Sequence, residues 1–467
     1  MYRRILFGQQ KLELPFGVEL DAENRWVKLS RIMPWDKIEE IYVSNFKGTT
    51  GQVAKSSRLA FGALYIQNRL VLTDEETVEQ IRETPAMQYF CGFDSYTTEK
   101  PFDSSLLVHF RKRITKEMMK EISEEAFAAE AKKAIEEEDD DKDGNGGGNG
   151  ESKPNKGRLL LDSTCCPSDI SYPTDINLLN NARELTEEII DNLHEQNMCQ
   201  GFEKPQTHDK AARRDYINFI KKRKHNNDEV RLAIQQQLQY VRQNLDSITK
   251  QEEQGANLDS LGRVLKEKLL VISEVYRQQK QMYDENSHSI EDRIVSISQP
   301  YIRPIVRGKA NAPVEFGAKV ATAHIGGFSF LIHMGYDNFA EANYLEKSAE
   351  EYKRMFGFYP EVIIGDKAYP TNLNRDYCKK MGIRLSALSR GRKSEEFKEA
   401  EREQLYQDNC KRNAVEGDYG NGKRKYGLGL IMEKLIDTTL TTISFGFFVK
   451  NMERLLKISR STKPSTT

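Results

Sequence analysis

The fold is decided by the stretch Glu361-Val-Ile-Ile-Gly-Asp366, in which a short apolar run leads into an aspartate. Arg158-Leu-Leu-Leu-Asp162 repeats the pattern, and both runs predict buried strands. A carboxylate beside a buried strand is costly unless it is paired or binds a metal ion. The alternative is that each aspartate caps a following helix, which Asp162-Ser-Thr would allow. Two apolar strands of one sheet that each lead into an aspartate favour a functional site over two helix caps.

Around these two strands the pattern alternates between strands and helices, which predicts an α/β fold with a mixed sheet and helices on its faces. Gly326-Gly327 is typical of a hairpin turn. The further strands are expected at residues 293–297, 314–323, 328–334 and 383–388. The helices are expected at residues 344–356 and 374–381, and from 394 onward with a break around 417–422. A helical insert is expected from helices at residues 176–196, 227–250 and 257–283.

The N-terminal part predicts a separate, mainly helical domain over residues 1–126. Residues 1–50 look irregular, and helices are expected from 56 to 90 and from 104 to 122, with Thr73 as a helix cap. The remaining predicted segments are an acidic, Gly-rich flexible linker at 127–157, an α/β core at 158–175 and 290–455, the insert at 176–289 and a disordered tail at 456–467.

Charge and composition restrict the class of protein. Residues 121–151 hold twelve acids and three lysines, so the rest of the chain carries +8 although the total is −1. A basic folded part fits a nucleic-acid partner. No apolar run is long enough to span a membrane, no signal peptide is recognisable, and the six cysteines show no metal or disulfide spacing. We therefore expect a cytoplasmic protein with reduced cysteines and no membrane partner.

A third acidic element lies late in the chain, in Arg412-Asn-Ala-Val-Glu416-Gly-Asp-Tyr-Gly-Asn-Gly-Lys423. Arg412 and Glu416 are four residues apart and share a helix face. From the spacing alone, an ordinary surface ion pair is the favoured explanation.

Together, these segments resemble the catalytic blocks of bacterial insertion-sequence DDE transposases, which have a ribonuclease-H-like core with a five-stranded mixed sheet. Arg412, Glu416 and Lys423 match the R-x(3)-E-x(6)-K spacing of that family, and Asp366-Lys-Ala-Tyr369 is similar to its D-x-x-Y block. Residues 70–90 resemble its N-terminal helical domain, so the resemblance implies that residues 1–126 form a DNA-binding domain and that residues 158–175 and 290–455 form the catalytic core. The family's tyrosine three residues before the arginine is Asn409 here, with Tyr406 as an unsupported substitute.

The resemblance implies that Asp162, Asp366 and Glu416 are catalytic and hold Mg²⁺, with Mn²⁺ as a substitute. Three carboxylates without His or Cys suit that ion. Water then attacks at the transposon end, and the freed 3′-hydroxyl attacks target DNA. Arg412 and Lys423 bind the phosphates that flank the cut.

Double-stranded DNA, comprising terminal inverted repeats and target, is the expected partner, and a homodimer is expected on it. A basic stretch with interleaved aromatics, Tyr216 and Phe219, is one candidate for DNA contact; a solvated helix face or a localisation signal is its alternative. The candidate DNA-binding residues are Arg412, Lys423, Arg424, Lys210, Arg213, Arg214, Lys221, Lys222, Arg223, Lys224, Arg111, Lys112, Arg113, Arg390, Arg392 and Lys393. His324 and His333 are interpreted as packing residues.

Two other functions stay open on the sequence. One is a structure-specific DNA nuclease on the same fold, without strand transfer. The other is a catalytically inactive DNA-binding descendant, against which the intact acidic trio argues.

Overall fold

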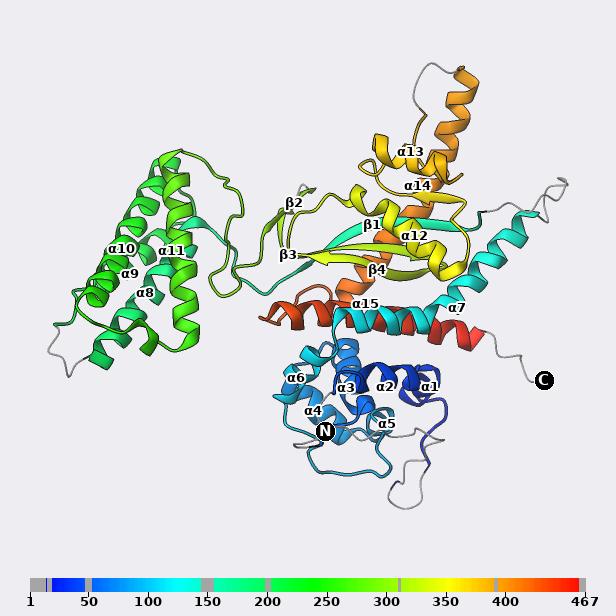
Figure 1. The fold of residues 1–467 in the computed structure, drawn as a ribbon, viewed down its shortest axis with the longest axis horizontal. Helices are drawn as coiled ribbons and strands as arrows, with labels where there is room; N and C mark the ends of the chain where they lie inside the picture. Colours follow the sequence, from blue (N-terminus) through cyan, green and yellow to red (C-terminus); the bar gives the residue numbers. More distant parts are fainter. Residues whose placement is uncertain are drawn as a thin grey trace. The chain divides into compact units, whose positions relative to one another are not determined.

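The computed structural model describes residue 14 and residues 19–46, 53–143, 155–197, 203–309, 312–389 and 394–461. The chain divides into two compact units, coloured by sequence in Figure 1. Unit 1 comprises Met1–Asp169 and Ala318–Thr467, and unit 2 comprises Ile170–Gly317. The predicted insert, residues 176–289, lies within unit 2, which extends further at both ends. No helix in the described ranges is long and apolar enough to cross a membrane.

The strands of this α/β fold form one mixed sheet in the order β2-β3-β1-β5-β6, with β4 also paired to β3. β1 is parallel to β5 and β5 to β6, whereas β3 runs antiparallel to β4 and to β2. β2 and the start of β3 belong to unit 2. The part of the sheet that lies in unit 1 therefore consists of five strands, which are β1, the rest of β3, β4, β5 and β6. The strands are β1 (Arg158–Pro167), β2 (Pro304–Lys309), β3 (Ala312–Ile325), β4 (Phe328–Gly335), β5 (Val362–Ile364) and β6 (Arg384–Leu385).

The two faces of β1 differ. Leu159 and Leu161 are fully or almost fully buried and belong to the main core, with side chains of α7, α12 and α15. Arg158, Leu160 and Asp162 alternate with them and point to the other face, because successive strand side chains point in opposite directions. α14 packs on β1. These helices are α7 (Lys116–Asp143), α12 (Leu345–Phe356), α14 (Glu395–Lys425) and α15 (Ile436–Ser461).

The predicted hairpin between β3 and β4 is confirmed, with Gly326 and Gly327 at φ +55° and +82°. Glycine adopts this left-handed region at little cost, which suits a two-residue turn. A Cβ on Gly326 would also lie 2.9 Å from the backbone of Ala131, so the turn packs directly on α7.

The N-terminal part is helical in its described elements, and the expectation of irregular structure is wrong for residues 25–43, whereas residues 1–13, 15–18 and 47–50 lie outside the described residues. Asn24 caps α1 through the Trp26 amide, and buried Trp26 and Trp35 anchor the first two helices. Thr73 caps α4, as predicted. The helices are α1 (Arg25–Ile32), α2 (Trp35–Val43), α3 (Ser57–Leu70), α4 (Asp74–Glu83), α5 (Pro85–Phe90) and α6 (Leu106–Arg113).

These helices do not form a core of their own. Phe61 of α3 packs against Phe445 and Phe448 of α15, at ring-centroid distances of 4.8 and 5.4 Å. Phe127 of α7 stacks on Phe328 of β4 at 5.5 Å. One continuous apolar cluster therefore joins the N-terminal helices to the sheet, and the predicted boundary at residue 126 does not separate compact units.

The prediction of a flexible linker from residue 127 is wrong as far as residue 143. α7 runs to Asp143, and Phe127, Ala131 and Ile135 are buried at helical spacing beneath the acidic residues. The acidic run is thus the solvated side of an amphipathic helix. Residues 144–154 lie outside the described residues. The predicted tail is likewise helical over 456–461, and 462–467 lie outside the described part.

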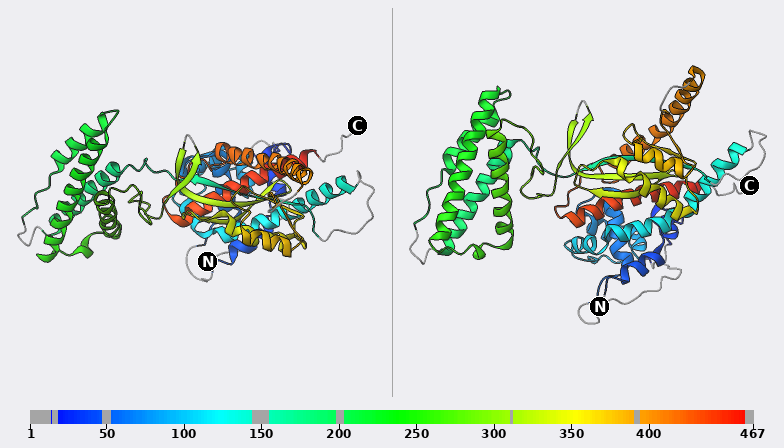
Figure 2. Two further views of the ribbon diagram at one scale, coloured as in Figure 1. Left: turned by 90° about the horizontal axis from the view of Figure 1, so that it is seen from above. Right: turned by 45° about the horizontal axis from the view of Figure 1, so that its top comes forward.

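Unit 2 contains a bundle of four helices, visible side by side in Figures 1 and 2. Asn226 and Glu229 form a reciprocal capping box that fixes the start of α10. The helices are α8 (Asp175–Asn197), α9 (Asp209–Lys221), α10 (Asn227–Glu253) and α11 (Arg263–Asp284), the last preceded by the short turn η3 (Leu258–Ser260).

The strand predicted at residues 293–297 is absent. Ile294 and Ile297 instead pack into the apolar core of the helix bundle. The Gln278 side chain accepts from the Ile294 amide and donates to the Asp292 carbonyl, so these backbone groups are satisfied without a neighbouring strand.

The break predicted near residues 417–422 is also misplaced, because α14 is continuous to Lys425 and the interruption falls at 426–435. Gly422 serves close packing instead: a Cβ there would lie 2.9 Å from Leu428 in the returning loop. Two elements complete unit 1, η4 (Glu341–Tyr344) and α13 (Asn372–Lys380).

Candidate functional site

Strand pairing brings Asp162 and Asp366 together. In the parallel pair β1–β5, Leu160 is aligned with Ile364. Each aspartate follows its aligned residue by two positions, so both lie at the same level and on the same side of the sheet. Neighbouring strands are only about 4.8 Å apart. The two carboxylates repel each other, and the charge of Asp366 therefore contributes to raising the pKa of Asp162.

Asp162 lies in an environment that disfavours its charge. Burial raises the pKa of its carboxyl to about 6, and the nearby charges of Glu341 and Asp366 act in the same direction. The Ser163 amide donates to Asp162 Oδ1 at 2.8 Å, and the Arg412 guanidinium also opposes the shift. A buried carboxylate with too little positive charge around it is suited to binding a cation.

Asp366 is held in a tight turn. Its Oδ1 accepts from the Ala368 amide at 2.7 Å. The ring of Tyr369, 2% exposed, lies against Gly365, where a Cβ would approach Tyr369 Cδ2 to 2.6 Å. Gly365 is therefore required for the tyrosine of the D-x-x-Y block to pack against the backbone beside the aspartate.

Neither aspartate is a helix cap. β1 continues through Asp162 to Pro167, and the helix after Asp366 begins at Asn372 with Thr371 as its cap. The helix-cap alternative raised by the sequence is therefore excluded for both residues.

α14 places Arg412 near Asp162. Its side chain is 23% exposed, and its charge acts on both Asp162 and Tyr369. The Arg412 Nε is buried without a hydrogen-bond partner. An unsatisfied guanidinium N–H that faces an acidic site is suited to an anionic ligand such as a phosphate oxygen.

Glu416 is not gathered with the aspartates. Its side chain is 64% exposed, and Oε1 lies 3.8 Å from Arg412 Nη2, which is the surface ion pair that spacing alone favoured. Across the described ranges, no three His, Cys, Asp or Glu side chains are close enough to hold a metal ion together. The strand-borne pair is in place, and the third acid points to solvent.

An acid that the sequence did not single out lies beside Asp162. Glu341, at the start of η4, accepts from the Ser163 hydroxyl and pairs with Lys319 Nζ at 3.1 Å. Its side chain is 15% exposed, and its charge contributes to the raised pKa of Asp162. No motif marks this residue, because it follows neither an apolar run nor a recognisable spacing.

The tyrosine missing at Asn409 is not replaced by Tyr406, which is 66% exposed. Two other tyrosines lie close to the acids. Burial raises the pKa of both Tyr369 and Tyr419, and the charge of Asp162 raises both further. Tyr419 could have been suspected from the sequence, because it lies seven residues after Arg412, on the same helix face.

The candidate DNA-binding residues of α6 differ in exposure. Arg111 is 5% exposed and donates to both carboxylate oxygens of Asp74 and to Gln67, so its assignment to a DNA surface is wrong. Lys112 is exposed, and Arg113 lies over the Phe46 ring at 5.3 Å. In α6 the basic cluster is therefore partly structural.

The basic stretch of unit 2 is exposed, but its aromatics are engaged. Tyr216 donates to Asn177 at 3.2 Å, and Phe219 stacks on His225 at 3.8 Å. The exposed cations are Lys210, Arg213, Arg214, Lys221, Lys222, Arg223 and Lys224, of which Lys222 pairs with Glu229. These cations present charge to solvent, whereas the two aromatic side chains already have partners within unit 2.

The remaining candidates are spread over unit 1. Lys423 is half-buried and Arg424 exposed in the last turn of α14. Arg390, Arg392 and Lys393 lie outside the described residues. His324 and His333 are packed as predicted: His324 is buried in a hydrogen-bond network, and His333 stacks on Tyr344 at 4.5 Å.

Two segments of the chain, one near each end, match family models of transposases. Residues 16–113 match the family model described as "Transposase domain (DUF772)", and residues 363–453 match "Transposase DDE domain". An uncharacterized protein, ORF8 in the nfe locus of Rhizobium meliloti, is 31% identical over 160 residues, which is 34% of this chain and 69% of that protein. No solved structure matches.

The second match covers Asp366, Arg412, Glu416 and Lys423, and the first covers α1 to α6. Asp162 lies on β1, between the two matched regions of the chain, and the pairing of β1 with β5 brings it close to Asp366 in the second matched region. The chain therefore belongs to the insertion-sequence transposases that carry a DDE domain and an N-terminal DUF772 transposase domain.

Proposed function

We propose that the chain is an active transposase, which cuts transposon ends and joins them to target DNA at Asp162, Asp366 and Glu416. The observation that carries this proposal is the register of the parallel strands β1 and β5, which brings Asp162 within β1 and Asp366 just after β5 close together, with the partly exposed Arg412 acting on Asp162. The strand order β4-β3-β1-β5-β6, with acids on the central strand and its parallel neighbour, supports a ribonuclease-H-like core.

The donor set suits Mg²⁺, or Mn²⁺ in its place, because carboxylate oxygens are the ligands these ions prefer. The raised pKa of Asp162 and the nearby charge of Asp366 indicate a local excess of negative charge, which a divalent cation would relieve. When bound, such ions activate the attacking oxygen and stabilise the leaving oxygen of the phosphodiester. Asp162 and Asp366, together with a third carboxylate, are the residues that would hold the ions.

The third carboxylate is assigned to Glu416 on the motif and on its position one turn after Arg412. In this assignment its side chain turns from solvent toward the aspartates. Glu341 is the competing candidate, because it is largely buried and its charge already acts on Asp162. The two candidates are separable by substitution.

The roles of the remaining residues follow from charge. Arg412, with its unpartnered Nε, would bind a phosphate at the cut, and Lys423 and Arg424 would bind flanking phosphates. The exposed cations Arg213, Arg214, Lys221, Lys222, Arg223 and Lys224 and the N-terminal Arg113 would bind the duplex backbone. Transposition needs two ends held together, so we propose that a homodimer forms on DNA.

A joining assay tests the proposal. The full-length protein is incubated with Mg²⁺, a plasmid target and a precut duplex that carries the DNA bordering its gene. We expect covalent joining of the 3′ end to the plasmid, and its loss in Asp366→Asn and Glu416→Gln with DNA binding retained. Glu341→Gln is the matched acid variant, expected to keep joining.

Each other outcome favours a different function. Mg²⁺-dependent nicking without joining favours the structure-specific nuclease. DNA binding by the wild type with neither reaction favours the inactive descendant. Loss of activity in Glu341→Gln with activity kept in Glu416→Gln would transfer the third position to Glu341.

A further inference from the structure

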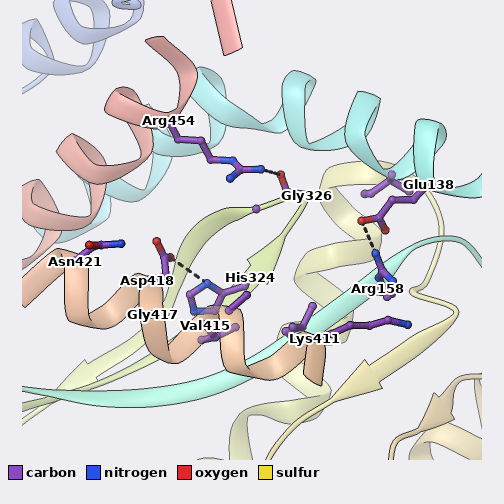
Figure 3. A pocket seen from close by; sticks show the side chains of 14 residues that line it. Glu138, Arg158, His324, Gly326, Lys411, Val415, Gly417, Asp418, Asn421 and Arg454 are labelled. Carbon is purple, nitrogen blue, oxygen red and sulfur yellow. Dashed lines mark hydrogen bonds and ion pairs between the residues drawn. The ribbon is translucent and has the colours of Figure 1, made fainter. Parts of the chain in front are cut away.

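A buried chain of polar side chains connects α14 to the β3–β4 hairpin and to α15. Asp418 of α14 forms an ion pair with Lys450 of α15, and both contact the Ser329 hydroxyl of β4. Ser329 Oγ lies 2.9 Å from His324 Nδ1, which continues the chain into β3. Figure 3 shows Asp418 and His324 next to each other in the lining of a pocket of about 500 Å³ beside α14, with His324 Nδ1 3.5 Å from Asp418 Oδ2.

The chain continues from His324 toward the aspartates. His324 Nε2 lies 2.9 Å from Thr322 Oγ1, and Thr322 Oγ1 is hydrogen-bonded to the Tyr419 hydroxyl. Tyr419 is buried, and the charge of Asp162 acts on it. The network therefore extends from Lys450 to the immediate surroundings of Asp162.

Apart from Asp418, whose side chain is 29% exposed, the members are deeply buried and hydrogen-bonded to one another. Lys450 is 6% exposed, His324 is 5% exposed, and Ser329 and Thr322 are almost fully buried. Buried polar groups of this kind are costly unless every partner is in place, which makes such networks geometrically demanding. A small rotation or slide of α14 would break several of these hydrogen bonds at once.

The same helix carries the residues of the proposed site. Asp418 and Tyr419 follow Glu416 by two and three positions, and Tyr419 lies two turns from Arg412 on one face. Glu416 itself is held only loosely, by an ion pair with Arg412 at 3.8 Å. What fixes the direction of Glu416 is therefore the anchoring of α14 around it.

We propose that Asp418, Tyr419 and Lys450 are positioning residues, which fix the rotation of α14, hold Arg412 beside Asp162 and keep Glu416 one turn away, where its side chain can turn toward the aspartates. This inference rests on the proposed function of the aspartates and Glu416. The role belongs to the whole network, because Ser329, His324 and Thr322 join its two ends.

The test separates positioning from stability. Lys450→Met leaves Asp418 without its partner, whereas Asp418→Asn with Lys450→Met removes both charges and keeps the volume. Removing both members of a buried pair is often neutral for stability, and removing one is not. We expect a fall in Tm of roughly 5 °C or more for the single variant and recovery to within about 2 °C for the double variant.

Cleavage should not recover with stability. In the double variant we expect Mg²⁺-dependent cleavage to stay about 10- to 100-fold below wild type, the range expected of a misplaced group. Mn²⁺ binding by the full chain, followed by electron paramagnetic resonance of the free ion, should weaken in parallel. Hydrogen exchange should accelerate in residues 408–422. Tyr419→Phe should give a smaller shift in the same three measurements.

Arg69→Met is the matched control, because Arg69 pairs with Glu453 on the same α15 at 2.6 Å and is not a member of the Asp418–Lys450 network, its contact near α14 being with the ring of the C-cap residue Tyr426. It should lower Tm without changing the Mn²⁺ affinity. Recovery of both cleavage and Mn²⁺ binding in the stable double variant would overturn the positioning role. If Asp366→Asn cleaves like wild type, the proposed function fails instead, and the two failures are distinguishable.

Discussion

The strand-borne acids and the helix-borne acid of the proposed site are held by different means. Asp162 and Asp366 owe their proximity to backbone register, since Leu160 and Ile364 are aligned two residues before them. Glu416 has no such constraint, and its 64% exposed side chain depends on how α14 is anchored. Main-chain pairing thus sets one half of the site directly, and side-chain contacts between distant helices set the other.

The largest expected effect comes from the strand half. Asp162→Asn removes one negative charge and keeps the shape, so the fold should be retained. Cleavage should fall about 1000-fold or more, as when a member of a catalytic set is lost. The measurement is the rate of plasmid nicking in Mg²⁺, with circular dichroism as the check on folding. Nicking within a factor of ten of wild type would refute the assignment of Asp162.

Gly365→Ala tests whether the strand half is rigid. The new methyl would lie 2.6 Å from the Tyr369 ring, so the turn that holds Asp366 must move. We expect a loss of about 1–3 kcal/mol in unfolding free energy and a fall in cleavage of about 100-fold. Gly335→Ala, where a Cβ meets nothing closer than 3.5 Å, is the control and should change neither quantity. Equal behaviour of the two variants would contradict the role of Gly365.

The anchoring of α14 should be sensitive to acid. Burial, aided by Lys450 and opposed by Asp418, lowers the pKa of His324 to about 3, so the folded protein keeps this ring neutral. The unfolded chain takes up a proton below about pH 6.5. Stability should therefore fall as the pH falls, with His324 accounting for about 2 kcal/mol between pH 7 and pH 5.

Urea unfolding at the two pH values measures this contribution. The variant His324→Gln should lose about that much less stability than wild type on acidification. An identical pH dependence in both proteins would show that His324 is protonated without cost.

The smallest effect is expected for substitutions of the exposed cations of unit 2, which are not part of the proposed acidic site. Substituting alanine for Lys221, Lys222, Arg223 and Lys224 should weaken duplex binding roughly tenfold and reduce its salt dependence by about 0.9 per lost phosphate contact. Alanine at Arg242 and Lys250, two exposed cations of α10, is the control. Binding titrations at several salt concentrations provide the measurement, and an unchanged slope would remove this stretch from the DNA surface.

The sequence predicted the strand half of the site better than the helix half, for a physical reason. An apolar run that ends in an aspartate carries its own burial signal, so β1, β5 and their acids could be located directly. The anchoring of α14 depends on Lys450, His324 and Ser329, which are separated along the chain and carry no local pattern. Glu341 was missed for the same reason.

The errors in the fold prediction arose where local residue composition was given more weight than the helical periodicity of the apolar residues. The acidic run after residue 126 concealed the buried Phe127, Ala131 and Ile135, and so a helix was taken for a linker. The glycines at 417, 420 and 422 suggested a break, although Gly422 only allows Leu428 to approach. Arg111 counted as a surface cation because burial by Asp74 and Gln67 cannot be seen in a local pattern.

The position of unit 2 in the chain has an evolutionary consequence. It departs after β1 and returns within β3, and these two strands are neighbours in the sheet. The alignment of β1 with β5 involves no residue of the excursion. The 170–317 segment can therefore diverge or be exchanged as a cassette while the acids on β1 and after β5 keep their spacing, so selection can act on the two parts of the gene at different rates.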